Sequence, residues 1–225
     1  MNTVHRAIEV LEHGAGISEL VLERQSVSFT PGDCVALFAA DGRTSRPYSI
    51  ASGADEDVLR FLVRRVDGGQ VSPYLCRRET GDRVKMSPPF GWFRPAGPPD
   101  GAPRIYVATG TGIAPFLSTM RSTPTTSPDM CLYGVRHRLN AIDVPWLRSR
   151  CDLRVAVSRE AAAGCHHGRV TDVLDDVPHG KDTHYYLCGL DTMIDEVTAW
   201  LESNGVPIRR IHRECFFNAS FETPP

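Results

Sequence analysis

Short runs of alternating apolar and polar residues fill the first 90 residues of the chain. A period of two is typical of β-strands with one buried face. Turns rich in glycine and aspartate separate the runs, as at His13–Gly16 and Asp67–Gly69. Strands are predicted at Thr3–Val10, Ile17–Glu23, Cys34–Ala39, Arg46–Ile50, Val58–Val66 and Arg83–Ser87, with a short helix at Ser72–Glu79. This spacing indicates an antiparallel six-stranded β-barrel.

The pattern changes after a Pro/Gly-rich segment at residues 94–103. Such a segment predicts a domain boundary, which we place between 97 and 98, giving domains 1–97 and 98–225. The second domain alternates strands with helices, which predicts an α/β fold with a parallel sheet. Strands are expected at Arg104–Ala108, Met130–Gly134, Leu153–Val157, His184–Cys188 and Arg210–Cys215. Helices are expected at Pro115–Arg121, Ala141–Ser149, Val170–Leu174 and Thr192–Asn204.

Composition narrows the class of protein. The 225 residues are 41% hydrophobic and carry a formal net charge of -2, so no overall positive field favours nucleic acid or a membrane surface. No apolar run reaches the ~18 residues that a bilayer span needs. We expect a cytoplasmic monomer that binds neither nucleic acid nor membrane.

Metal binding is not expected either. The seven cysteines contain no Cys-x-x-Cys pair, which argues against a zinc ribbon or an iron–sulfur cluster in this chain. Cys165-His166-His167 has the residue types of a metal site but lacks further ligands nearby, so a loop is favoured there.

Thr109–Pro115 follows the first strand of the second domain and contains Gly110 and Gly112. Glycines allow a phosphate to approach the backbone, and the helix that follows directs free N–H groups at the same point. The spacing is not that of G-x-G-x-x-G, and a plain strand-to-helix turn explains the segment equally well.

Arg46-Pro47-Tyr48-Ser49 lies in the barrel half. An arginine pairs with phosphate, an aromatic ring stacks, and a hydroxyl bonds a ring nitrogen. Alone, the segment also reads as an ordinary edge strand, where Pro47 is tolerated.

Taken together and in order, five motifs resemble those of the ferredoxin–NADP reductase family. They are Arg46–Ser49, Gly69–Ser72, Gly110–Pro115, Cys188–Met193 and Glu214–Phe216. The resemblance covers nearly the whole chain and implies an FAD-binding barrel followed by an NAD(P)-binding domain. One departure is Ser87, which stands where several members have glycine before the linker.

The resemblance implies a set of FAD contacts, with Ser49 near the reactive N5 and Phe216 shielding the flavin ring. These are Arg46, Pro47, Tyr48, Ser49, Leu62, Val63, Arg64, Gly69, Gln70, Val71, Ser72, Thr111 and Phe216. Because no long insertion offers a platform for adenine, FMN stays an alternative to FAD.

The resemblance also implies NAD(P) contacts, with Ser158 and Arg159 at the 2′-phosphate of NADPH and Cys188 and Glu214 beside the nicotinamide. These are Thr109, Gly110, Thr111, Gly112, Ile113, Arg136, Ser158, Arg159, Cys188, Gly189, Leu190, Asp191 and Met193. NADPH is favoured and NADH stays possible. Ser49, Cys188 and Glu214 are the expected catalytic residues.

The implied activity is hydride transfer between NAD(P)H and flavin, followed by single-electron transfer to a separate carrier, ferredoxin or flavodoxin. An acidic carrier would suit a group of basic residues, namely Arg64, Arg65, Arg77, Arg78, Arg83 and Lys85, although a solvated face explains them equally. Two alternatives remain: the reductase component of a multicomponent oxygenase, and a non-catalytic flavin-binding regulatory subunit.

Overall fold

The first domain is an antiparallel barrel. The computed structural model describes residues 1–14, 16–97, 101–122 and 127–216. Its first six strands and first helix are β1 (Thr3–Glu12), β2 (Ile17–Glu23), β3 (Cys34–Phe38), β4 (Ser45–Ser49), β5 (Val58–Arg64), α1 (Ser72–Cys76) and β6 (Arg83–Met86). They form one sheet in the order β4-β3-β6-β1-β2-β5. A bridge between Ile50 and Phe61 joins the two edge strands and completes the barrel.

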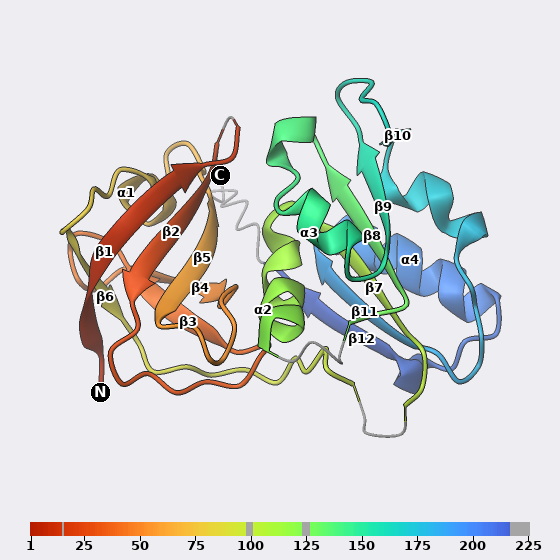
Figure 1. Cartoon of the computed structure of the whole chain (residues 1–225), viewed down its shortest axis with the longest axis horizontal. Coiled ribbons are helices and arrows are strands. Elements are labelled where there is room, and N and C mark those ends of the chain that lie inside the picture. The colour runs from red at the N-terminus through yellow and green to blue at the C-terminus, as the bar shows by residue number, and fades with distance from the viewer. Residues whose placement is uncertain (15, 98–100, 123–126, 217–225) are drawn as a thin grey trace, which may run out of the picture.

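The second domain is a parallel sheet with helices on both faces (Figure 1). Its strands are β7 (Arg104–Thr109), β8 (Met130–Val135), β9 (Asp152–Val157), β10 (His166–His167), β11 (His184–Gly189) and β12 (Ile211–Cys215). Its helices are η1 (Gly110–Ile113), α2 (Ala114–Ser122), η3 (Arg138–Asn140), α3 (Val144–Arg148), η4 (Val170–Asp176), α4 (Asp191–Ser203) and η5 (Ile208–Arg210). The sheet order is β10-β9-β8-β7-β11-β12, so β7 and β11 are neighbours at the point where the chain reverses direction across the sheet.

Alternation along the parallel strands explains the layers. Tyr106 and Ala108 pack on the face covered by α2 and α3, whereas Ile105 and Val107 pack on the face covered by α4 and η4. Each strand therefore buries both of its faces, as parallel sheets require. Figure 1 shows α2 on the side of the sheet that faces the barrel.

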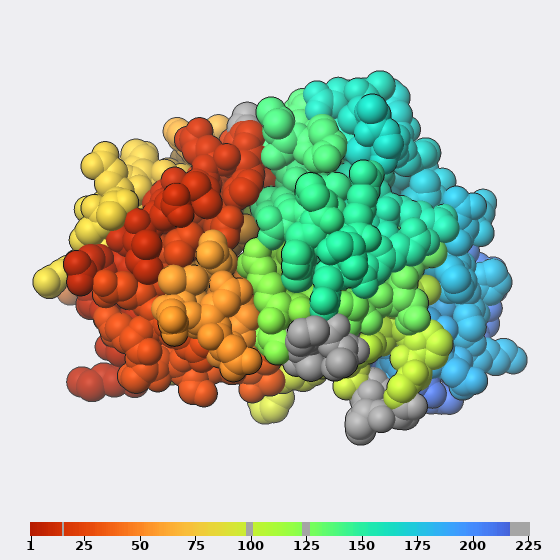
Figure 2. All heavy atoms as spheres, in the orientation of Figure 1, coloured from red at the N-terminus to blue at the C-terminus, as the bar shows by residue number. Residues whose placement is uncertain are grey.

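The two domains share a core. Barrel residues Ile17, Ala51 and Leu62 belong to the same buried apolar cluster as Leu117 of α2. Figure 2 shows one face of the molecule, on which barrel atoms abut those of the second domain along a continuous seam. The relative position of the domains is therefore set by buried contacts.

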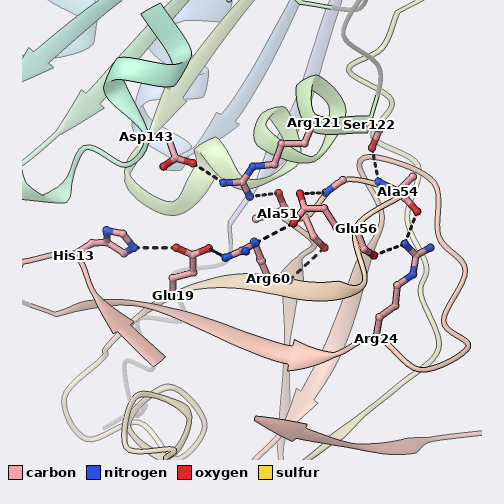
Figure 3. A network of polar contacts seen from close by, with 12 residues as sticks. His13, Glu19, Arg24, Ala51, Ala54, Glu56, Arg60, Arg121, Ser122 and Asp143 are labelled. Atoms are coloured by element: carbon pink, nitrogen blue, oxygen red, sulfur yellow. Dashed lines mark hydrogen bonds and ion pairs between the residues drawn. The ribbon is translucent and has the colours of Figure 1, made fainter. Parts of the chain in front are cut away.

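Polar contacts at the end of α2 cross the same boundary (Figure 3). Arg121 donates a hydrogen bond to the carbonyl of Ala51 at 2.8 Å and pairs with Asp143 at 2.5 Å. The Ser122 hydroxyl accepts a hydrogen bond from the Ala54 N–H at 2.7 Å. The bonds to Ala51 and Ala54 tie α2 to the loop that follows β4, and the pair with Asp143 holds Arg121 from within the second domain.

Glu19 lies on the barrel side of this boundary, buried beneath His13 and Arg60. Its carboxylate contacts His13 Nε2 and Arg60 Nη1, each at 3.0 Å. Burial by itself would raise the pKa of Glu19, but the hydrogen bonds from His13 and Arg60 outweigh it, so the pKa lies below its ordinary value.

The predicted elements are present, and strand ends differ from prediction by one or two residues. The predicted helix at Ala141–Ser149 is shorter, because Asp143 adopts φ 51° and Pro145 lies in the first turn of α3. The helix at Ser72–Glu79 ends at Cys76, and that at Val170–Leu174 is a 3-10 helix. The loop at Cys165–His167 contains the short strand β10.

Two further predictions from the sequence concern membrane-spanning segments and the domain boundary. In the described part of the chain, no helix has the length and apolar character needed to cross a bilayer. The predicted boundary after Gly97 falls beside residues 98–100, which lie outside the described residues, and we keep it as a proposal.

Candidate active site

A large cavity lies between the barrel and the carboxyl ends of the parallel strands. Its volume is about 1520 Å³, above the ~300–1000 Å³ of sites for one small ligand. Its walls come from β4, β5 and the segment before α1 on one side, and from the ends of β7, β8, β9 and β11 on the other. Because open α/β sheets bind ligands at such strand ends, the cavity suits two ligands in contact.

Most of the predicted site residues lie on its walls. From the predicted flavin set these are Arg46, Pro47, Tyr48, Ser49, Leu62, Arg64, Gly69, Gln70, Val71, Ser72, Thr111 and Phe216. From the predicted coenzyme set they are Thr109, Gly110, Thr111, Arg136, Ser158, Arg159, Gly189, Leu190 and Met193, and Glu214 lies there too.

Ser49 and Glu214 meet across the cavity although 165 positions separate them in sequence. The Ser49 hydroxyl donates a hydrogen bond to Glu214 Oε1 at 3.2 Å. Burial raises the pKa of Glu214, against the opposing effects of the Ser49 hydrogen bond and of Arg94. A carboxyl group that retains its proton above the ordinary range is suited to proton exchange inside a closed site.

Cys34 belongs to the same group and was not predicted. It is the register partner of Ser49 on β3 and lines the cavity. Burial, followed by the negative charges of Glu214 and Asp33, raises the pKa of the Cys34 thiol to about 11, so it remains protonated. The antiparallel pairing of β3 with β4 is the signal that would have identified it.

Tyr48 of β4 lines the cavity and packs against the barrel core. Burial raises the pKa of its hydroxyl, so the ring stays neutral. Its neighbour Arg46 donates to the carbonyl of Ser45 at 2.9 Å. On an edge strand the outward position of Pro47 leaves no ladder bond unmade.

The segment from Val66 to Ser72 forms a tight loop on the cavity wall. Ser72 Oγ accepts a hydrogen bond from the Val66 N–H at 3.0 Å, and the Gly69 N–H bonds to the Val66 carbonyl at 3.0 Å. The loop therefore presents Gly69 and Gln70 to the cavity in a fixed conformation.

Arg64 and Arg136 bring positive charge to the cavity from the two domains. A Cβ on Gly110 would lie 3.3 Å from an Arg64 Nη atom, so the guanidinium rests on the turn after β7. Burial, followed by repulsion from Arg136, lowers the pKa of Arg64. Arg64 forms no ion pair with any described residue. A half-buried cation without an ion-pair partner among the described residues is suited to an anion such as a phosphate.

Glycines let the turn after β7 pack onto the end of β11. A Cβ on Gly112 would lie 2.3 Å from the Cys188 carbonyl oxygen, and a Cβ on Gly189, at φ +139°, would lie 2.1 Å from Thr109 Oγ1. Thr109 Oγ1 in turn accepts a hydrogen bond from the Leu190 N–H at 2.9 Å. Gly112 is therefore needed for the close packing of this turn against β11, and phosphate binding by the segment stays a prediction.

Five predicted residues do not line the cavity: Val63, Gly112, Ile113, Cys188 and Asp191. Val63 points into the barrel core, because strand alternation sends Leu62 and Arg64 to the cavity. Cys188 is fully buried in the core cluster under α2, and burial, followed by Glu214 and Cys215, raises its pKa far above the ordinary value. Cys188 is nevertheless the register partner of Glu214 on β12, and its role beside the nicotinamide stays a prediction.

Other wall residues were missed by sequence reasoning. Arg169 and Glu196 line the part of the cavity that Ser158 and Arg159 border. Arg169 comes directly after Gly168, which has φ +148°, and Glu196 lies one turn after Thr192 on α4. The sequence signal for Arg169 was the glycine–arginine pair to which it belongs. No sequence signal marked Glu196.

The predicted basic group does not form one free surface. Arg64 lies in the cavity, Arg65 pairs with Asp67, and Arg78 pairs with Asp82. Arg65 and Arg77 border a separate small cavity, and Lys85 donates to the Gly42 carbonyl at 2.7 Å. The structure divides these residues among four places.

Comparisons with known proteins agree with this arrangement. The profile of the oxidoreductase FAD-binding domain matches residues 8–94, and that of the oxidoreductase NAD-binding domain matches residues 106–199. Ferredoxin–NADP reductase B of Sorangium cellulosum is 31% identical over 225 aligned residues, which cover 89% of this chain and 91% of that protein.

A reductase subunit of an aromatic O-demethylase from Amycolatopsis is 31% identical over 211 residues, 87% of this chain but 63% of that protein. The chain thus spans about six-tenths of such relatives. The crystal structure of a ferredoxin NADP+ reductase from Neisseria gonorrhoeae with bound FAD and NADP has a TM-score of 0.87 at 21% identity, with 96% of this chain and 99% of that chain covered. By its two domains and its relatives, the chain belongs to the ferredoxin–NADP reductase family of FAD- and NAD(P)-binding flavoproteins.

Proposed function

We propose that this protein transfers hydride between NADPH and a bound FAD, and single electrons between that flavin and a separate protein carrier. The hydrogen bond between Ser49 and Glu214 carries the proposal, since it joins the predicted flavin wall to the predicted nicotinamide wall. Bound flavin supplies the exchange between two-electron and one-electron steps. The chain's own residues supply binding, orientation and the placement of protons.

The cavity walls fit both cofactors. In this proposal Arg46 and Arg64 hold the phosphates of FAD, Tyr48 contacts its ring system and Ser49 bonds a ring nitrogen; all four line the cavity. Arg64 lies beside Gly110 and is repelled by Arg136, so an anion held between the arginines relieves that repulsion.

The coenzyme end of the cavity favours NADPH over NADH. Ser158, Arg159 and Arg136 border the cavity there, and the Arg159 N–H bonds to the Arg136 carbonyl at 2.9 Å, which holds the two cations on adjacent strand ends. Arginine pairs are suited to the doubly charged 2′-phosphate. Arg169 adds a third cation to the same wall.

Proton placement follows from burial. Because its pKa is raised, the Glu214 carboxyl keeps its proton at a higher pH than an ordinary carboxyl does. It also accepts a hydrogen bond from the Ser49 hydroxyl. In this proposal the two side chains pass a proton to and from the cavity. Phe216, which packs on the core cluster under α2 and lines the cavity, excludes water from that centre.

Anaerobic reduction of the purified yellow protein tests the proposal. NADPH should bleach the flavin spectrum within seconds, and NADH more slowly. A spectrum unchanged by either coenzyme would exclude the enzyme and favour a flavin-binding regulatory subunit.

Ser49→Ala tests the role of the hydroxyl. We expect stopped-flow reduction by NADPH to slow by about 10²-fold, in the range of lost proton-transfer groups, while FAD is retained. Ser45→Ala, on the same strand but off the cavity wall, is the matched control. An unchanged rate in Ser49→Ala, or equal losses in both variants, would remove Ser49 from the chemistry.

The relatives also support a second, narrower function, namely that of the reductase component of a multicomponent oxygenase. Several relatives are reductase components of aromatic-ring oxygenases or of an O-demethylase. We infer a ferredoxin-like carrier before flavodoxin, and a monomer in the cytoplasm. Sedimentation of the holoprotein tests the oligomeric state, and reoxidation by ferredoxin and by flavodoxin tests the acceptor.

A further inference from the structure

Helix α2 extends from the cavity to the boundary between the two domains. It begins at Ala114, which lines the cavity directly after η1, and its nine residues span about 13 Å. Every residue from Ala114 to Met120 is buried. Apolar burial is non-directional, so it holds the helix in its layer more firmly than it fixes the position of the helix along its own axis. Directional bonds at the end of the helix are suited to fix that position.

Arg121, in the last turn of α2, makes such bonds to both domains (Figure 3). One guanidinium nitrogen donates to the Ala51 carbonyl at 2.8 Å, and the other pairs with Asp143 at 2.5 Å. The ring of Trp146, on α3, lies 5.9 Å from the Arg121 Cζ. The Arg121 side chain is 17% exposed, so water competes little for these bonds. A guanidinium presents its donors in a fixed fork, which a single donor does not reproduce.

The Ala51 carbonyl belongs to the barrel segment that carries Ser49. Ser49 ends β4, and Ala51 follows it by two residues. The Ile50 N–H donates to the Asp33 carbonyl at 3.0 Å, and the Ala51 N–H donates to the Arg60 carbonyl at 2.8 Å. Because backbone bonds hold this segment on both sides, the bond from α2 to Ala51 acts on a rigid unit that includes Ser49.

The surroundings of this bond are closely packed in both domains. A Cβ on Gly53 would lie 3.1 Å from the Arg121 carbonyl oxygen, so the backbone of the barrel loop lies against the helix end. On the other side, Asp143 precedes α3 in the left-handed conformation, with φ 51°. Residues in that conformation persist where their surroundings hold them. Arg121 therefore joins two fixed backbone segments, one from each domain.

We propose that Arg121 is a positioning residue for hydride transfer, which holds the coenzyme wall at the start of α2 in a fixed relation to Ser49 on the flavin wall. The inference rests on the proposed function. In that reaction the C4–H bond of NADPH breaks and an N5–H bond forms on the flavin, and both electrons move with the hydride, so NADPH is oxidised to NADP+ and FAD is reduced to FADH−. Arg121 does not line the cavity and acts through the backbone. A misplacement of about 1 Å far from the chemistry can slow such a step about 10²-fold.

The test compares Arg121→Gln with Arg24→Gln in the full-length holoprotein. Arg24 is the matched control, because it donates to the carbonyls of Ala54 and Glu56 in the same loop, and its hydrogen bonds to described residues stay within the barrel. Stopped-flow reduction by NADPH measures the limiting rate and the apparent Kd. We expect Arg121→Gln to lower the limiting rate about 10- to 10²-fold with the Kd within about twofold of wild type, and Arg24→Gln to change neither. NADPH with deuterium at the transferred position should retain its isotope effect in Arg121→Gln, because the slowed step is the transfer.

A second readout needs no turnover. Amide hydrogen exchange of the oxidised holoprotein without coenzyme reports local opening. Arg121→Gln should speed exchange at residues 118–122 and 50–53, whereas Arg24→Gln should speed it at residues 54–57 alone. If Arg121→Gln does not fold, Asp143→Asn replaces it, since asparagine tolerates the left-handed conformation but removes the ion pair. Its limiting rate should fall at least about threefold, and an unchanged rate would overturn the proposal.

The outcomes separate the positioning role from the activity. An unchanged limiting rate in Arg121→Gln, a rise in Kd that accounts for the whole loss, or an equal loss in Arg24→Gln would overturn the positioning role. Faster exchange at residues 118–122 with an unchanged limiting rate would also overturn it, because the contact would then only stabilise the boundary. In each of these cases the wild type is still reduced by NADPH, and the proposed function stands. Wild type that neither NADPH nor NADH reduces would refute the proposed function, and the positioning role with it.

Discussion

Glu19→Gln probes a buried ion-pair network within the barrel, next to its boundary with the second domain. The Glu19 side chain is only 7% exposed and contacts His13 and Arg60 at 3.0 Å each. A net contribution of about 1.5–3 kcal/mol is typical for each hydrogen bond to a charged group. Glutamine keeps one acceptor oxygen, and Arg60, whose side chain is 30% exposed, retains its pair with Glu56 at 3.0 Å. We therefore expect a net loss of about 2 kcal/mol, discounted for solvent screening of Arg60.

For a chain of this length, that loss corresponds to a fall in Tm of about 4–8 °C. Thermal and urea unfolding of the purified protein, followed by circular dichroism, measure it. Glu23→Gln is the matched control. The side chains of Arg6 and Glu23 are 64% and 36% exposed, so their ion pair should contribute under about 0.5 kcal/mol to the free energy of unfolding.

The pH dependence gives a second readout. The folded pKa of Glu19 lies below its ordinary value of 4.5, so its stabilising effect is present above that value and is lost as pH falls through the folded pKa. The gap between wild type and Glu19→Gln should therefore be largest near neutral pH and close in acid. Equal destabilisation by Glu19→Gln and Glu23→Gln, or a gap that widens in acid, would refute the reasoning.

Three further predictions concern the cavity and the turn after β7. Arg159→Ala should raise the KM for NADPH about tenfold and leave the KM for NADH nearly unchanged; a similar rise for both coenzymes would contradict the 2′-phosphate assignment. Because burial raises the pKa of Glu214, wild-type apoprotein should lose stability relative to Glu214→Gln as pH rises from about 4.5 through the raised pKa; a gap that is constant with pH would show that Glu214 titrates normally. Gly112→Ala should cost at least about 2 kcal/mol, because its Cβ meets backbone at 2.3 Å; Gly180→Ala, whose Cβ meets only the Thr183 hydroxyl at 3.0 Å, is the control in the same unfolding assay.

Local pattern was sufficient for the fold class, whereas the resemblance to a known family supplied most of the residues that line the cavity. Strand alternation identified the barrel strands, and the alternation of strands with helices identified the parallel sheet. Arg46–Ser49 was weak evidence alone, but its order relative to the later motifs gave it meaning. Three of those motifs, at Gly110, Cys188 and Glu214, lie at the ends of β7, β11 and β12, which the parallel sheet brings to one edge.

Other features depended on distances that no local pattern encodes. Sequence placed Cys188 at a strand end but did not reveal that its side chain points under α2, because facing depends on which sheet face the helix covers. It also did not show that Arg65, Arg78 and Lys85 each bind a different neighbour within the barrel.

The sequence by itself determined two domains, their classes, the family and the residues that line most of the cavity, because these follow from periodicity and motif order. Only the tertiary structure decided that Ser49 meets Glu214 and that Arg64 lies near Arg136. The physical reason is that these relations join segments brought together by the shared core of the two domains. Contacts across that core are set by packing and burial of the whole chain, not by the preferences of any one segment.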